Sequence, residues 1–440
     1  MKNRLFTSLI SLAAVISITG CFKHTSYTGA KELRNPEGMD HSYNYKDTTD
    51  ANYVLFKEKL RSFSSKLSES YAKREFDKEN NIVISPLSAE MCLGLAVCAS
   101  DGETRQELLN VFGLDYNTFN KYYKLYFNEL SLERKNSAKQ LTSMLLLANS
   151  IWIDDEVSLK DSGLDSLKNN YYSYSYNVDF DKKNKQANQA IREFVKDKTK
   201  GLINQDLNIS PDTLFMLMNT LYLKDIWNDE GSNMSYASGD YKFTNYNGSV
   251  SSKSLLNGYY NSGKIISNTN YSSFYTKTLS GFKIFFVKPN VGKDIKDVFT
   301  KDTIDYVINS DSYTYIDVEK KEVYFTNCIF PEYSAKSDID LVNIFKEDFN
   351  VQTLFDGRCN FSNLSKDSVY CSDFKQVSKL EVNKKGIEGA AVTYMAYAGS
   401  AGPGELTNVY DTFVVDRSFG FVLTNNSSDI IFSGIVTNID

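Results

Sequence analysis

The sequence predicts one large α+β domain, and three observations carry this prediction. Helix-like apolar spacing dominates the early part of the chain and strand-like apolar runs dominate the late part, which is typical of α+β folds with mostly antiparallel sheets. Tyr (30) and Phe (28) are abundant, as suits a core rich in β-structure. Residues 51–440 contain no internal repeat and no Pro-, Gly- or Ser-rich linker, so we expect a single domain there.

The expected elements follow from the spacing of apolar residues. Apolar side chains recur at intervals of three and four in three segments, which predicts helices at 53–72, 187–198 and 338–349. Continuous apolar runs predict strands at 145–153, 214–223, 282–287, 323–330, 419–425 and 430–436.

Histidine is nearly absent from the chain, and this excludes common catalytic mechanisms. Both copies, His24 and His41, precede residue 50, so the body has no imidazole for a Ser-His-Asp or Cys-His site. No Cys-x-x-Cys pair, Gly-x-Ser-x-Gly elbow or Walker-type loop occurs, and GSAGPG at 399–404 lacks the flanking strand and helix of a phosphate loop. We therefore expect neither an enzyme nor a bound metal or cofactor.

The charge balance is acidic. The net charge of −6 at pH 7 becomes −8 when Lys2 and Arg4 are removed with the first 20 residues. Contacts to phosphates need a basic face, so nucleic acid is excluded as the main partner.

The amino terminus is typical of an export signal. A short positive region precedes an apolar run at 5–20, which is too short to span a bilayer comfortably. The run ends in Ile-Thr-Gly-Cys, which resembles a bacterial lipobox that would place lipid on Cys21; an ordinary signal peptide is the alternative. We expect 1–20 to be a lipoprotein signal peptide and 21–50 a flexible tether. The body would then lie on the extracellular face of the bacterial envelope, or be secreted if the lipobox is not used.

Five cysteines remain after Cys21. Cys92 and Cys98 lie in an apolar run, where we expect free core thiols. An extracellular address permits disulfides, and a bridge between Cys359 and Cys371 is left open.

Several segments, taken in order, resemble the serpins, the serine protease inhibitor fold family. In NIVISPLSAEMCLGLAVCASDGETRQELLNVFGLD (81–115), Ser85-Pro86-Leu87-Ser88 matches the family's Ser-Pro-x-Ser, and Pro86 suits a helix start. Further matching segments are ANSIWI (148–153), YNVDF (176–180), MNTLYLKDIW (218–227), 330–365, 380–394 and 416–438. The resemblance covers about 50–440 and implies the serpin fold, in which helices pack on large, mostly antiparallel sheets.

The resemblance implies an inhibitor rather than a catalyst. An exposed reactive loop, here about 386–416, is bait for a protease that cleaves it and forms an acyl-enzyme. The freed loop then inserts as a new strand into the main sheet, and the protease is distorted before water hydrolyses the ester.

Residues 386–398 meet the requirements of an inserting segment because they contain no proline and many small side chains. Strand alternation places Ile387, Gly389, Ala391, Thr393, Met395 and Tyr397 on one face, and leaves Glu388 on the other face, in water. The hinge implied by the resemblance consists of Gly386, Ile387, Glu388, Gly389, Ala390, Ala391, Val392 and Thr393.

The resemblance also implies a buried polar cluster that controls the opening of the main sheet. It corresponds to Ser85, Ser88 and Asn219, with Gln376 at the place of the family's usual His. Gln can both donate and accept hydrogen bonds, so such a network could persist in altered form. Trp227 matches a Trp at the top of the sheet, where the loop first enters.

Departures from the family pattern keep a second function open. Lys384 stands where Glu is usual, Ile387 where Thr or Ser is usual, and Gly389 where Ala is usual, and the loop is longer than is typical. The leading hypothesis is a monomeric, suicide-type inhibitor of extracellular serine proteases. The alternative is a non-inhibitory serpin that acts as a surface binding or adhesion module.

Family spacing places the reactive bond at Ser400–Ala401, with Tyr397–Ala398 as the alternative. Residues 386–416 contain no Lys or Arg, which argues against a trypsin-like target because the trypsin pocket binds a cation. Small residues favour elastase-like or subtilisin-like serine proteases, and papain-like cysteine proteases are the second choice.

Overall fold

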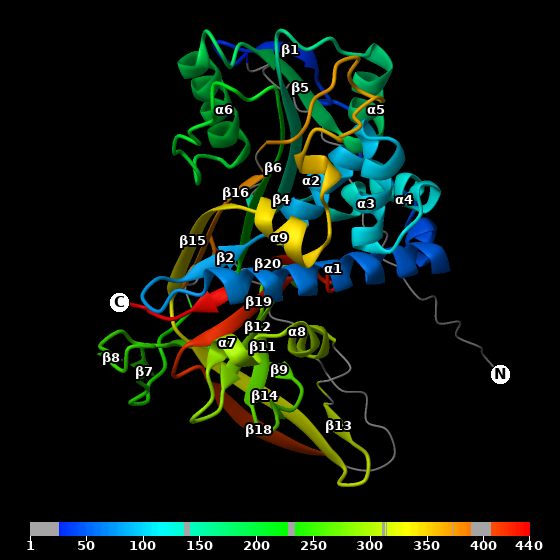
Figure 1. Cartoon of the computed structure of the whole chain (residues 1–440). Helices are drawn as coiled ribbons and strands as arrows, with labels where there is room; N and C mark the ends of the chain where they lie inside the picture. The colour runs from blue at the N-terminus through cyan, green and yellow to red at the C-terminus, as the bar shows by residue number, and fades with distance from the viewer. Residues whose placement is uncertain are drawn as a thin grey trace, which may run out of the picture.

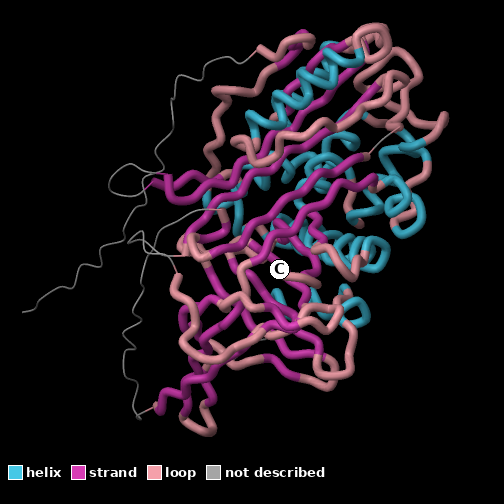
Figure 2. The backbone as a smooth tube through the Cα atoms, turned by 90° about the vertical axis from the view of Figure 1, so that its left-hand side faces the viewer, coloured by secondary structure: helices cyan, strands magenta, loops and turns pink. Residues whose placement is uncertain are grey.

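Two large β-sheets and a smaller third sheet organise the described part of the chain (Figure 1). The computed structural model describes residues 26–135, 141–227, 234–309, 313, 315–372, 374–388 and 406–440. Figure 2 shows the strands running side by side, with most of the helices gathered on one side of them. This arrangement confirms the predicted α+β class.

The helices are α1 (Ala51–Glu75), α2 (Pro86–Ala99), α3 (Gly102–Phe112), α4 (Tyr116–Leu130), α5 (Asp161–Tyr171), α6 (Asn184–Lys198), α7 (Ile295–Val298), α8 (Lys301–Ile308) and α9 (Val342–Asp348). The predicted helices at 53–72 and 187–198 are confirmed as parts of α1 and α6. The prediction of a helix over 338–349 was wrong at its start, because residues 338–340 are paired with a neighbouring strand.

The main sheet has the order β1 (Lys31–Arg34), β5 (Ser173–Val178), β4 (Leu141–Asp154), β6 (Phe215–Ile226), β17 (Gly386–Ile387), β16 (Lys375–Asn383) and β15 (Tyr333–Asp340), and β3 (Leu132–Lys135) also pairs with β4. Its neighbours are antiparallel except for β4 and β5.

The second sheet has the order β10 (Ile266–Ser267), β11 (Tyr271–Lys277), β12 (Lys283–Pro289), β19 (Phe419–Thr424), β20 (Ile430–Val436) and β2 (Ile82–Ile84). The third contains β13 (Ile316–Asp317), β14 (Glu322–Phe330), β18 (Thr407–Val414) and β9 (Leu256–Ser262), and β7 (Phe243–Thr244) pairs with β8 (Val250–Ser251). All six predicted strands are present.

Both faces of the central strand β6 are covered. Leu217 and Leu221 belong to the core that contains α2, whereas Met216 and Met218 pack with the apolar residues of α6. Figure 1 shows α2 and α6 on opposite sides of β4 and β6. A strand buried on both faces needs an almost continuous apolar sequence, which explains the run at 214–223.

Residues 26–50 contradict the expected flexible tether. The structure includes β1, which adds a strand to the main sheet beside β5, and a short 3-10 helix at Tyr45–Thr49. Tyr27 is buried, and His41 stacks on Tyr172 with ring centroids 4.4 Å apart. Polar composition suggested a tether because the few apolar residues here are too far apart to give a periodic pattern.

Cys92, Cys98 and Cys328 are buried free thiols, as expected for the first two. Cys359 is also a free thiol, so the bridge to Cys371 that the sequence left open is not formed. Within the described residues, no helix has the length and apolarity needed to cross a bilayer. Cys21 and the signal sequence lie outside the described residues.

Candidate functional site between two strands of the main sheet

A short strand enters the main sheet between β6 and β16. Among the described residues, these two strands are joined only through β17, which is two residues long. Ile387 lies opposite Asp225 of β6 and Val382 of β16, and the Glu388 amide donates to the carbonyl of Glu381 at 3.3 Å. The chain from β16 therefore turns back and begins to fill the space between its two neighbours.

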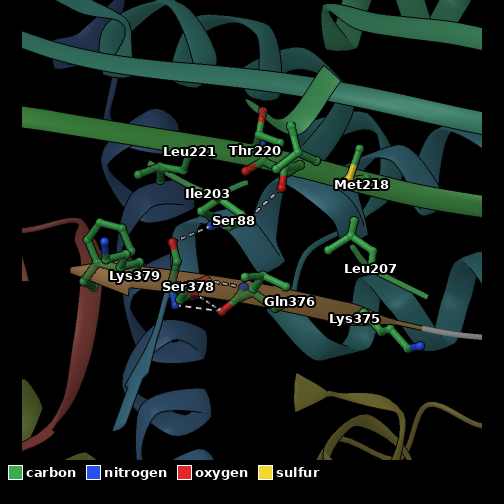
Figure 3. Close-up of a pocket in the computed structure, with 15 residues that line it drawn as sticks. Ser88, Ile203, Leu207, Met218, Thr220, Leu221, Lys375, Gln376, Ser378 and Lys379 are labelled. Carbon is green, nitrogen blue, oxygen red and sulfur yellow. Dashed lines mark hydrogen bonds between the residues drawn. The ribbon is translucent and has the colours of Figure 1, made fainter. Parts of the chain in front are cut away.

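Below this short strand, two small cavities continue the interval between β6 and β16. The first, of about 10 Å³, is lined by apolar side chains that include Leu221, Leu380 and Ile387. The second, of about 50 Å³, lies at the level of Gln376 and Asn219. Figure 3 shows Gln376 and Ser378 on one strand and Met218 and Thr220 on the strand across this cavity. The cavities thus extend from the hinge toward the polar cluster.

Gln376 and Ser85 form the centre of the polar cluster. The Ser85 amide donates to Gln376 Oε1 at 2.8 Å, and Gln376 Nε2 donates to the Ser85 carbonyl at 2.9 Å. Ser85 Oγ donates to the carbonyl of Ile431 at 2.8 Å and caps α2 by accepting from the Ser88 amide at 3.2 Å. The cluster therefore ties β16, the start of α2 and β20 together.

Asn219 joins the cluster from β6. Ser88 Oγ donates to the Asn219 carbonyl at 3.4 Å, and Asn219 Nδ2 donates to Asn149 Oδ1 at 2.9 Å. Asn149 also donates to the hydroxyl of Tyr123 at 3.0 Å. Asn219 Oδ1 is buried and has no hydrogen-bond partner in the described residues. The structure thus brings together all four residues that the sequence assigned to this cluster.

Two members of the network, Asn149 and Ser378, were not predicted from the sequence. Asn149 lies opposite Asn219 in the pairing of β4 with β6, and Ser378 Oγ donates to Gln376 Oε1 at 3.1 Å. One signal was available for Asn149, because 145–153 and 214–223 are apolar runs that each contain one central Asn.

The hinge begins with a glycine that no other residue could replace without strain. Gly386 has a φ of +153°, and a β-carbon there would lie 2.3 Å from the carbonyl oxygen of Asp225. Ile387 is fully buried among apolar neighbours. Its apolar side chain, a departure from the family pattern, therefore fits the site that it occupies.

Glu388 lies on the face opposite Ile387, as the alternation predicted, but it is only partly exposed to water. Its backbone has a φ of +41°, and Oε1 accepts a hydrogen bond from the Tyr222 hydroxyl at 3.3 Å. Oε2 is buried without a partner among the described residues. Burial, with a further contribution from Glu381, raises the pKa of Glu388, and burial with the Glu388 carboxylate raises the pKa of Tyr222 to about 12. Tyr222 and Ile387 lie on opposite faces of the sheet, so the alternation of faces holds at Glu388.

The turn at the top of the sheet is held by Trp227 and Glu332. Trp227 Nε1 donates to the Asn383 carbonyl at 2.6 Å, and the Lys384 amide donates to Glu332 Oε1 at 2.7 Å. The Lys384 ammonium lies 5.9 Å from the ring centroid of Tyr236. Because Glu332 binds the backbone of Lys384, this contact does not depend on the residue that the family usually has there.

The remaining predicted residues fall outside the described part of the chain. They are the hinge residues Gly389, Ala390, Ala391, Val392 and Thr393, the reactive-bond residues Ser400 and Ala401, and the alternatives Tyr397 and Ala398. The segment that contains them starts in the main sheet after Glu388 and ends at Leu406, just before β18 of the third sheet.

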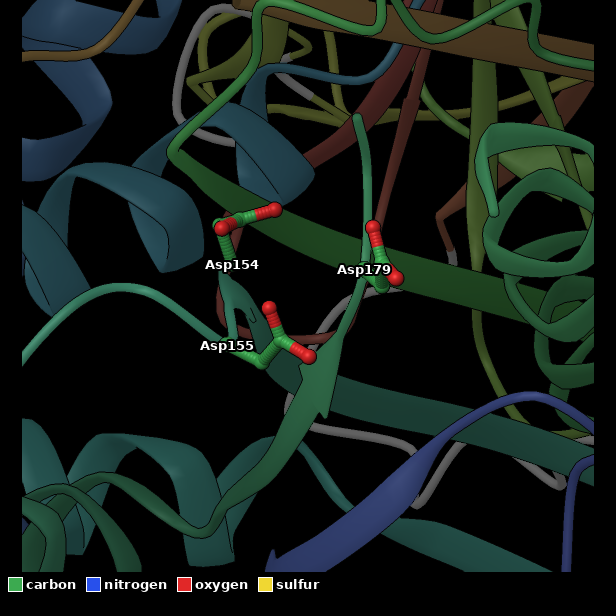
Figure 4. Close-up of side chains that lie close together, drawn as sticks. All are labelled: Asp154, Asp155 and Asp179. Atoms are coloured by element: carbon green, nitrogen blue, oxygen red, sulfur yellow. The ribbon is translucent and has the colours of Figure 1, made fainter. Parts of the chain in front are cut away.

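Three acidic side chains, Asp154, Asp155 and Asp179, lie close together at another end of the main sheet (Figure 4). Asp154 accepts hydrogen bonds from the amide of Phe180 at 2.8 Å, and Asp179 forms an ion pair with Lys183 at 2.8 Å. Through these contacts, the carboxylates of Asp154 and Asp179 stabilise the ends of a strand and a helix.

Comparison with known proteins identifies the class to which this fold and site belong. The sequence model of the serpin family, described as serine protease inhibitor, matches residues 58–439. The chain is 24% identical to Iripin-1 of Ixodes ricinus over 388 residues, which cover 82% of this chain and 90% of Iripin-1. It is 23% identical to human neuroserpin, with 82% and 87% of the two chains covered. The chain belongs to the serpins, which are generally inhibitors of proteases rather than enzymes.

Solved structures give the same fold. The native-state structure of Tengpin, a thermophilic serpin, matches with a TM-score of 0.69 and 22% identity, covering 87% of this chain and 95% of that one. Thyroxine-binding globulin in complex with thyroxine matches with a TM-score of 0.69 and 18% identity, covering 88% and 99%.

Proposed function

We propose that this serpin is a suicide-type inhibitor of extracellular proteases, which traps the acyl-enzyme by inserting its cleaved loop between β6 and β16. The observation that carries the proposal is that Gly386 and Ile387, the first residues of the hinge, already pair with both strands of this interval. The cavities below Ile387 leave the next part of the interval incompletely filled.

The register supports an inserted strand that reaches the polar cluster. Continuing both pairings six residues beyond Ile387 brings Thr393 opposite Gln376 on one side and Asn219 on the other. Residues directly opposite each other share a face of the sheet, so Thr393 would face the same side as the buried Ile387. Its hydroxyl could then donate to Asn219 Oδ1, which is buried and has no partner among the described residues.

Insertion would be driven by backbone pairing and burial. The added strand gains hydrogen bonds along β6 and β16, whose facing edges are joined only at β17 among the described residues. The inserted side chains Gly389, Ala391 and Thr393 are small, which suits cavities of this size. The mechanism needs no catalytic group of the serpin, because the protease supplies the nucleophile and the bait loop supplies the scissile bond.

The test is incubation of the purified protein with elastase, subtilisin, trypsin and papain, followed by denaturing electrophoresis. Trapping leaves an ester- or thioester-linked complex that survives denaturant, and an elastase-like or subtilisin-like enzyme is the expected target. Cleavage at 395–405 without any covalent complex, for every protease tried, would contradict the proposal. That result would favour the alternative, a surface binding module.

The location of the protein at the cell envelope is part of the same proposal. A bait loop acts on extracellular proteases only if the protein is exported, and the lipobox-like sequence that ends at Cys21 would hold it at the envelope surface. Cys21→Ser should abolish lipid attachment, which mass spectrometry of the amino-terminal peptide detects. Partition of this variant into detergent equal to that of the native protein would contradict the lipid anchor.

A further inference from the structure

The amino-terminal segment 26–40 is packed against the part of the fold that covers the insertion site. β1 pairs with β5 at the edge of the main sheet, with Lys31 opposite Asn177 and Glu32 opposite Tyr176. The residues on either side of β1, Tyr27 and Glu37, each contact α6. We call this segment the amino-terminal strap.

Tyr27 is the first contact between the strap and α6. It is only 4% exposed and belongs to the core between α6 and the outer face of the main sheet. Its ring meets that of Phe194 edge-on with centroids 5.5 Å apart, and that of Tyr176 at 5.7 Å. Its hydroxyl donates to Asp197 at 3.0 Å. One side chain therefore joins the helix, the sheet and the strap.

Glu37 makes the second contact at the carboxyl end of α6. Its Oε1 lies 2.9 Å from Lys198 Nζ and accepts from the Tyr174 hydroxyl at 3.1 Å. The Lys198 and Glu37 side chains are only 14% and 20% exposed, so solvent screens this ion pair less than a surface pair. Lys198 also lies over the Tyr174 ring at 4.4 Å.

The helix that these contacts hold lies over the insertion path. Val195 of α6, together with Ile203 and Leu207 of the segment that follows, lines the 50 Å³ cavity between β6 and β16. A strand that enters between β6 and β16 must displace these three side chains or the backbone that carries them, because the cavity is too small for a strand. Any contact that fixes α6 to the sheet therefore raises the barrier to insertion.

We propose that the amino-terminal strap is a restraint on loop insertion, which acts through Tyr27 and Glu37 by holding α6 and residues 199–209 over the β6–β16 interval. The strap keeps the uncleaved chain from inserting its own loop before a protease arrives. The inference rests on the proposed insertion mechanism for its consequence, whereas the restraint on α6 can be measured without any protease.

The experiment compares Tyr27→Ala and Tyr27→Phe in the full chain by hydrogen exchange of α6 amides and by the rate of loop insertion on warming. Insertion is detected as loss of cleavage at 395–405 by subtilisin together with a higher thermal midpoint. Tyr27→Ala should increase both rates about tenfold, which corresponds to about 1.4 kcal/mol. Tyr27→Phe, which keeps the ring and loses only the bond to Asp197, should have a smaller effect of the same sign and guards against misfolding of the alanine variant.

Arg34→Ala is the matched control on the same strap. Arg34 pairs with Asp161 and Asp165 of α5 and leaves the α6 contacts intact, so α6 exchange and insertion should stay at native rates. Unchanged exchange in both Tyr27 variants, or equal acceleration in Arg34→Ala, would overturn the restraint. A different result would be faster α6 exchange in a chain whose loop inserts neither in any variant nor after cleavage. That result would overturn the insertion mechanism and with it the role assigned to the strap.

Discussion

Gln376 and Ser85, which lie far apart in the sequence, hold each other through two hydrogen bonds. The Gln376 amide accepts from the backbone nitrogen of Ser85 at 2.8 Å and donates to its backbone oxygen at 2.9 Å. One side chain thus satisfies both backbone groups of a buried residue that also caps α2. Because Gln376 lies on β16, separation of β16 from the helical core must break this pair.

Gln376→Ala should lower the free energy of unfolding by about 1–3 kcal/mol, because it removes the bond to the buried Ser85 amide, whereas the Ser85 carbonyl still accepts from the Ala89 amide at 3.2 Å. Urea denaturation measures the change. Lys379→Ala is the control on the same strand, since its ion pair with Glu381 is partly exposed and should contribute less than about 1 kcal/mol. Equal stability of Gln376→Ala and the native protein would show that the pair does not hold the sheet closed.

Glu388 should make hinge docking depend on pH. Its pKa is raised above the usual 4.5 in the docked hinge, so the docked state binds more protons than the undocked one. Docking is therefore weakest above the raised pKa and strengthens as the pH falls through it toward 4.5. Lys224 and Lys379, which face the same carboxylate, oppose the shift without cancelling it.

Glu388→Gln should strengthen docking at neutral pH and flatten this dependence. The measurement is the rate of loop insertion on warming, taken between pH 5 and 7 by native electrophoresis. Glu58→Gln, on the exposed face of α1, is the control and should keep the native profile. A pH profile of Glu388→Gln identical to that of the native protein would show that Glu388 does not control hinge docking.

Thr393→Arg should turn the inhibitor into a substrate. In the proposed inserted strand this position would lie between Gln376 and Asn219, where a cation would be buried without a partner. The loop would still be cleaved, but insertion would stop before the cluster, and the ratio of cleaved serpin to covalent complex should rise at least tenfold. Thr393→Ser keeps the hydroxyl and should trap normally. Normal trapping by Thr393→Arg would show that the register differs.

Target specificity should follow the absence of Lys and Arg from 386–416. Trypsin needs a cation in its specificity pocket and should form no complex through this loop, whereas elastase or subtilisin should. Mass spectrometry of the released carboxyl-terminal fragment locates the cleaved bond, expected at Ser400–Ala401 or Tyr397–Ala398. A new amino terminus outside 395–411, or efficient trapping of trypsin, would overturn this assignment.

The sequence predicted the main elements and the polar cluster because their signals are local or carried by family motifs. Apolar runs located the strands, and the resemblance placed Gln376 beside Ser85 although no periodicity connects them. The partial burial of Glu388 was not predictable, because alternation assigns its face but not its contact with Tyr222. The packing of Tyr27 was missed because one aromatic in a polar segment gives no pattern, and its partners on α6 are distant in sequence.

The most direct test of the account is the thermal midpoint before and after a single cleavage within 395–405. Limited proteolysis with subtilisin or elastase produces the cleaved form, and differential scanning calorimetry compares it with the intact protein. If the loop inserts between β6 and β16, the sheet gains a strand that is paired on both sides, and the midpoint should rise by tens of degrees. A cleaved form that melts at or below the temperature of the intact protein would contradict insertion and the inhibitory mechanism built on it.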